Sequence, residues 1–108
     1  MLPKKNRADK KAIEKIFKEG KFVDSPNLTF KFIKTQKPSL LQVSFIVPKS
    51  ISKLAVKRNL LRRRGYMVVE KYLKHFPVGV VGVFVFRKYQ DDILILQNEI
   101  ENILTKIN

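Results

Sequence analysis

The feature that most constrains the fold is a nearly unbroken apolar run over residues 80–86. The run is too short for a typical helix and is rich in β-branched and aromatic residues, which favours a strand. A strand without a polar face has to be covered on both sides. The run therefore predicts a central strand that is buried on both faces.

Two further segments alternate apolar and polar residues, as strands with one face in a core do. They span residues 28–34 and 41–47, and a short polar loop joins them. This arrangement predicts an antiparallel hairpin. A brief strand around residues 21–23 could add to it.

Two amphipathic helices are predicted at the ends of the chain. The first spans residues 10–19, with Asp9 as its N-cap and Gly20 as its C-terminal stop. The last begins after Asp91 or Asp92, either of which can cap it. Its apolar stripe has helical period and consists of Ile93, Leu96, Ile100, Ile103, Leu104 and Ile107.

A basic segment predicts the longest helix, from about residue 53 to 75, capped by Ser50 or Ser52. Gly65 is expected near its buried side. One side of this helix is apolar, because spacings of seven, seven and four residues place four residues on the same face of the helix. They are Leu54, Leu61, Val68 and Tyr72. The opposite side carries Asn59, Arg62, Arg63 and Tyr66. With no carboxylate in residues 53–64, this presented face suits phosphate oxygens.

The expected order of elements is α-β-β-β-α-β-α. This order predicts an α+β fold in which helices pack on a mixed four-stranded β-sheet as a two-layer sandwich. The length of 108 residues fits a single domain over residues 1–108.

The charge of the chain indicates a polyanionic partner. Lys and Arg number 23 against 9 Asp and Glu, which gives a formal net charge of +14. Nucleic acid is the first candidate and an anionic membrane surface the second. The absence of cysteine fits a reducing compartment. No apolar run approaches the length of a signal peptide or a membrane span, so we expect a soluble cytoplasmic protein.

The residues show no recognisable catalytic constellation. The nine acids are scattered, the single histidine is His75 near a helix end, and no glycine-rich phosphate loop is present. Phosphodiester hydrolysis ordinarily needs metal ligands or a matched acid and base. The sequence therefore favours a binding protein, with no metal ligands and no small-molecule substrate.

The composition favours RNA over DNA as the partner. The sequence has no paired helix-turn-helix pattern, no zinc ligand set and no heptad zipper. Aromatic residues that could stack on unpaired bases are interleaved with the charge. They are Phe17, Phe22, Phe30, Phe32, Tyr66, Tyr72 and Tyr89, although most of the phenylalanines are expected in the core.

Three segments resemble the bacterial ribonuclease P protein component. Residues 43–49 read VSFIVPK and residues 55–63 read AVKRNLLRR, similar to the family's strand, loop and Arg-Asn-Arg helix. Residues 13–21, IEKIFKEGK, are similar to the family's opening helix. The resemblance covers nearly the whole chain. Leu60 stands where the family has a further arginine, and Arg64 is the candidate to compensate for it.

The resemblance implies a subunit of ribonuclease P, which removes the 5′ leader of precursor tRNA by endonucleolytic hydrolysis. The catalytic RNA, with Mg²⁺, would perform the chemistry, and the protein would bind that RNA and the leader. The resemblance also implies a left-handed crossover through the basic helix, against the usual rule.

The resemblance also implies residue roles. The RNA-binding residues would be Lys49, Lys53, Lys57, Arg58, Asn59, Arg62 and Arg63. The groove for the leader would be lined by Ile13, Phe17, Lys31 and Tyr66.

Three alternative functions remain compatible with the sequence. A ribosomal-type or scaffolding RNA-binding protein would share the charge without any role in cleavage. A standalone nuclease would be active without RNA. A basic membrane-surface protein is disfavoured, because the basic helix is rich in arginine rather than in snorkelling lysine.

Overall fold

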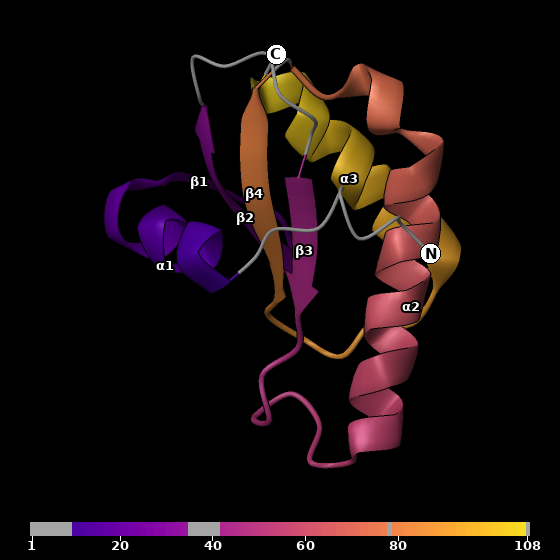
Figure 1. Cartoon of the computed structure of the whole chain (residues 1–108). Coiled ribbons are helices and arrows are strands. Elements are labelled where there is room, and N and C mark those ends of the chain that lie inside the picture. Colours follow the sequence, from indigo (N-terminus) through magenta and orange to yellow (C-terminus); the bar gives the residue numbers. More distant parts are fainter. Residues whose placement is uncertain (1–9, 35–41, 78, 108) are drawn as a thin grey trace.

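The structure is a computed structural model and describes residues 10–34, 42–77 and 79–107. Figure 1 shows the arrangement of its elements. In chain order they are α1 (Lys10–Glu19), β1 (Lys21–Asp24), β2 (Leu28–Lys34), β3 (Gln42–Ile46), α2 (Ala55–Lys71), the short 3₁₀ helix η2 (Leu73–His75), β4 (Val80–Phe86) and α3 (Ile93–Ile107). The predicted order of helices and strands on a mixed four-stranded sheet is confirmed.

The strand order in the sheet is β1-β2-β4-β3. β2 is antiparallel to both β1 and β4, whereas β3 is parallel to β4. The predicted central position of β4 is therefore confirmed, and the predicted hairpin of residues 28–34 with residues 41–47 is wrong. Residues 28–34 and 41–47 each alternate apolar and polar side chains, and that pattern identifies a strand without identifying its partner. The doubly buried β4 inserts between them.

The helices divide between the two faces of the sheet. α2 and α3 lie together on one face, and α1 lies on the other (Figure 1). The larger apolar core is under α2 and α3, and a smaller cluster around Ile16, Val81 and Val83 is under α1. The chain from β3 to its parallel neighbour β4 runs through α2, and the handedness of this crossover stays a prediction.

Stacked aromatic rings form the centre of the larger core. Phe84 of β4 has no exposed surface, and its ring lies 4.3 Å from that of Phe30 and 4.9 Å from that of Phe45, centroid to centroid. Its flanking strands thus each contribute one ring to the stack. Gly82 leaves space for the Phe30 ring of this stack, because a Cβ at position 82 would lie 2.3 Å from that ring.

The start of α2 differs from the prediction. The helix begins at Ala55 after Leu54, whose backbone is extended and whose side chain makes no cap hydrogen bond. Capping by Ser50 or Ser52 is therefore wrong. Instead, the Arg58 guanidinium donates to the carbonyl oxygens of Ser52 and Lys53, both at 2.9 Å. This contact holds the loop before the helix. Leu54 is exposed, contrary to the predicted burial.

The remainder of α2 packs as expected on its apolar side. Leu61 and Val68 are buried and Tyr72 is partly buried. Gly65 allows the helix to approach β3, because a Cβ there would lie 2.5 Å from the Phe45 ring. The helix ends at Lys71, four residues before the predicted end, and η2 continues to His75.

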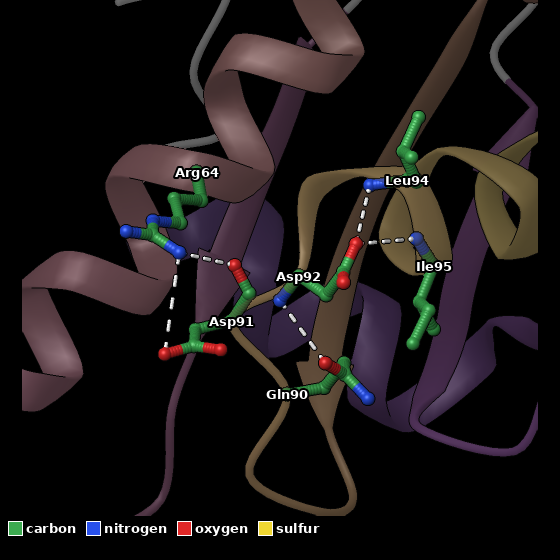
Figure 2. A network of polar contacts seen from close by, with 6 residues as sticks. All are labelled: Arg64, Gln90, Asp91, Asp92, Leu94 and Ile95. Carbon is green, nitrogen blue, oxygen red and sulfur yellow. Dashed lines mark hydrogen bonds and ion pairs between the residues drawn. The ribbon is translucent and has the colours of Figure 1, made fainter.

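The other predicted caps have mixed outcomes. Asp9 lies outside the described residues. The amide of Gly20 donates to the Ile16 carbonyl at 2.7 Å, which closes α1. At α3 the carboxylate of Asp92 accepts hydrogen bonds from the amides of Leu94 and Ile95, at 2.9 and 3.3 Å (Figure 2). Asp92, of the two candidates, is therefore the N-cap.

A buried carboxylate joins α3 to the turn between β1 and β2. Glu99 accepts hydrogen bonds from the Ser25 hydroxyl at 2.5 Å and from the backbone and side-chain nitrogens of Asn27 at 2.6 and 2.7 Å. These donors satisfy a charge that would be costly to bury alone. The scattered acids in the sequence gave no indication of this role.

Candidate nucleic-acid interface

The basic face of α2 is the first candidate surface. Asn59 and Arg63 are exposed and Arg62 is half-buried. The Arg62 guanidinium donates to the Asn59 side-chain oxygen. Within the described ranges, no carboxylate forms a hydrogen bond or ion pair with Asn59, Arg62 or Arg63. These three side chains, which we call the arginine face, can therefore offer several donors to phosphate oxygens.

Further cations surround the start of α2. Lys49, Lys53 and Lys57 are exposed. The Lys57 ammonium lies 5.8 Å from the centroid of the Tyr89 ring, a weak cation–π contact. Arg58 is half-buried because its guanidinium holds the preceding loop. The seven residues predicted to bind RNA thus lie on α2 or on the loop leading into it.

Arg64 points away from the arginine face. Its guanidinium donates to the backbone carbonyl of Asp91 at 2.5 Å and lies 4.0 Å from the carboxylate of Asp91 (Figure 2). These contacts attach α2 to the segment before α3. Arg64 therefore has a structural contact on the far side of the helix, and its expected compensation for Leu60 is not supported.

Tyr66 does not lie on the presented face, so this part of the prediction is wrong. Its side chain is 7% exposed, and its ring meets that of Phe45 edge-on at 5.1 Å. Its hydroxyl oxygen accepts a hydrogen bond from the Phe45 amide at 3.2 Å. The Tyr66 side chain extends from α2 and packs against β3, an edge strand of the sheet. The sheet separates it from Phe17 and Lys31, so it cannot line one groove with them.

Replacing Tyr66 with Phe should destabilise the fold without weakening RNA binding. The substitution keeps the ring but removes the acceptor of the buried Phe45 amide, which costs about 1.5 kcal/mol. Urea denaturation measures the stability, and titration with a single-stranded RNA measures the affinity. A loss of affinity at unchanged stability would show instead that the hydroxyl contacts RNA.

The predicted leader-groove residues from α1 and β2 do come together. Phe17 is 47% exposed, and the Lys31 ammonium lies 4.6 Å from the centroid of its ring. Ile13, one turn earlier on α1, is partly buried against the smaller apolar cluster. We call Ile13, Phe17 and Lys31 the α1 surface. It lies on the sheet face opposite to α2, so the two groups of predicted RNA contacts are on different sides of the molecule.

The aromatic residues separate into core and surface. Phe30, Phe32 and Tyr66 are buried, whereas Phe17, Phe22 and Tyr89 are exposed. Phe22, at 65%, is the most exposed of the phenylalanines that the structure describes. The family motifs gave it no role, and its place on a short strand gave no signal beyond its aromatic character.

Tyr72, at the C-terminal end of α2, contacts α3. Its hydroxyl donates to the Glu101 carboxylate on α3. This hydrogen bond, followed by desolvation and the negative charge of Glu101, raises the pKa of Tyr72 above its usual value. The contact fastens α2 to α3 and lies away from the arginine face.

The described residues contain no cluster of three or more potential metal ligands. No three His, Asp or Glu side chains of residues 10–34, 42–77 and 79–107 lie close enough together to hold an ion. None of the helices in these ranges is long and apolar enough to span a bilayer.

The fold is that of bacterial ribonuclease P proteins. The structure of the Staphylococcus aureus RNase P protein has a TM-score of 0.81 at 20% identity, covering 95% of both chains. The RNase P protein from Thermotoga maritima has a TM-score of 0.83 at 22% identity, covering 94% of this chain and 97% of the other. No curated protein sequence matches the chain.

The sequence model of the family described as Ribonuclease P matches residues 2–108. The chain belongs to the ribonuclease P family. Membership implies a subunit of ribonuclease P, the tRNA-processing endonuclease, and an RNA partner within a ribonucleoprotein.

Proposed function

We propose that the chain binds the catalytic RNA of ribonuclease P and the single-stranded 5′ leader of precursor tRNA, and so assists removal of the leader. The observation that carries the proposal is the arginine face, which forms no hydrogen bond or ion pair with a carboxylate of the described residues, in a chain of net charge +14. Planar guanidinium groups on one helix side match the geometry of phosphate oxygens. The ribonuclease P family and fold support the catalytic RNA as the partner.

In this proposal the RNA subunit carries out the hydrolysis. Hydrolysis of a phosphodiester with Mg²⁺ requires ligands that hold the ion beside the reacting phosphate. We propose that RNA oxygens provide these ligands. The protein would contribute fixed positive charge, which lowers the repulsion between RNA phosphates and so lowers the Mg²⁺ concentration needed for cleavage.

The arginine face and the α1 surface would bind different RNA segments. The arginine face and the lysines at the start of α2 would hold the catalytic RNA. The α1 surface would hold the leader, because the exposed ring of Phe17 can stack on a base while Lys31 meets a phosphate. A substrate bridging both subunits would dissociate more slowly than one bound by RNA alone.

Reconstitution tests the proposal. The protein is mixed with a bacterial ribonuclease P RNA and a precursor tRNA at limiting Mg²⁺, and the rate of 5′ cleavage is compared with that of the RNA alone. We expect faster cleavage and a lower Mg²⁺ requirement with the protein. Binding without any change in cleavage would favour a scaffolding protein. Cleavage by the protein without the RNA would indicate a standalone nuclease.

A further inference from the structure

An exposed aromatic side chain lies at the outer edge of the sheet. Phe22 belongs to β1, an edge strand, and is 65% exposed. In the antiparallel register it lies opposite Lys31 of β2, so the two side chains stand on the same face of the sheet. The Lys31 ammonium in turn lies over the Phe17 ring. One cation is thus flanked by two exposed rings from different elements.

Phe22 also borders a depression with a cavity volume of about 1000 Å³. Four lysines surround the depression, from α1, β1, β2 and α3, and the one acid among its lining residues is Glu19. The lysines are Lys15, Lys21, Lys34 and Lys106. An aromatic wall within a rim of excess positive charge suits a ligand that carries both a flat ring and a negative charge.

We propose that Phe22, Lys15, Lys21 and Lys34 form a further binding site for single-stranded RNA, which we call the β1-edge site. Phe22 stacks on an unpaired base, and the lysines contact the phosphates on either side of it. Exposed aromatics set among cations bind single strands in this way, because every base has a face that can stack. A duplex hides its bases, so the site selects unpaired RNA.

The β1-edge site extends the α1 surface and rests on the proposed function for its natural ligand. An RNA strand that stacks on Phe17 passes Lys31 and reaches Phe22 on the same sheet face. The leader of precursor tRNA is therefore the expected occupant, contacted by nucleotides farther from the cleavage site. β1 and β3 form opposite edges of the sheet, and α2 packs beside β3, so the arginine face is a separate contact.

A single tryptophan provides a direct test. The chain contains no tryptophan, so Phe22→Trp introduces one fluorophore at the site and keeps a ring able to stack. We expect its fluorescence to be quenched by a single-stranded RNA oligonucleotide and, in the reconstituted complex, by precursor tRNA with a long leader. Mature tRNA, which lacks a leader, should quench it much less.

Affinity measurements test the energetic contribution. Phe22→Ala should weaken binding of precursor tRNA with a long leader by about tenfold, a loss within the range for one stacked base. Binding of a substrate with a leader of one or two nucleotides should be unchanged. Leu94→Ala is the matched control, because Leu94 is a comparably exposed apolar side chain (69%) on α3. Circular dichroism verifies that each variant is folded.

The possible failures are distinct. Cleavage that responds to the protein while Phe22→Trp shows no quenching would overturn the β1-edge site and leave the proposed function standing. Quenching by an oligonucleotide without any effect of the protein on cleavage would support the site and reject the proposed function. Equal quenching by duplex RNA, or a fluorescence change with protein concentration alone, would overturn the proposal in favour of non-specific binding or pairing between copies of β1.

Discussion

Replacing both Arg62 and Arg63 with Ala should weaken single-stranded RNA binding by about 25-fold at an ionic strength of about 0.1 M. Each arginine that contacts a phosphate releases counterions, and each lost contact lowers the slope of log affinity against log salt by about 0.7. The double variant should therefore have a slope about 1.4 smaller. Titrations at several salt concentrations measure the affinity and the slope together.

Two matched variants show what the arginine face contributes beyond charge. Replacing Lys71 and Lys74 with Ala removes the same charge from exposed positions at the far end of α2 and in η2. We expect this variant to retain most of the slope. Changing Arg62 and Arg63 to Lys should keep the slope but weaken binding, because an ammonium cannot form the two parallel hydrogen bonds of a guanidinium. A slope unchanged in the alanine variant would mean that these arginines do not contact phosphate.

Replacing Phe84 with Ala should lower the free energy of unfolding by about 4 kcal/mol. Phe84 is fully buried on the central strand and stacks on both Phe30 and Phe45. Its loss leaves a cavity between two rings that neighbouring strands hold in place. Since domains of this size have a total stability of about 5–15 kcal/mol, a substantial fraction of the variant would be unfolded on warming. Urea denaturation followed by circular dichroism measures the change.

Phe22→Ala is the control for this experiment, since it removes the same atoms from an exposed position. Its expected cost is below about 1 kcal/mol. Similar losses in the two variants would mean that the stack of aromatic rings does not form the centre of the core.

The elements of the fold were predictable from local patterns, and their pairing was not. The apolar run of β4, the alternation of β2 and the stripe of α3 each follow from residues that are close in sequence. The partner of β3 depends on which strand β4 lies beside. β2 and β3 have similar alternating sequences, so nothing in their own residues distinguishes a hairpin from an inserted strand.

The sequence correctly predicted the solvent exposure of polar side chains in the candidate site that have no buried partner available. Asn59 and Arg63 face solvent as expected, since burying them would require partners that the helix does not have. Tyr66 was assigned to the wrong side of the helix because its side chain is long enough to leave the direction set by the helical period and to cover Phe45. Arg58 also donates to the Ser52 and Lys53 carbonyls, a contact that the sequence did not predict, and its role in RNA binding stays a prediction.

The position of β4 also determines when the chain can fold during synthesis. β4 completes the sheet, because β2 pairs with β1 and β4, and β3 pairs with β4, although β4 follows both strands in the chain and comes after the whole of α2. While the ribosome is still translating the arginine-rich helix, β3 has no strand to pair with and the β1–β2 pair lacks its neighbour β4. We therefore expect the complete sheet to assemble only after residues 80–86 have emerged, and repulsion between the positive charges would oppose premature collapse of the earlier segments.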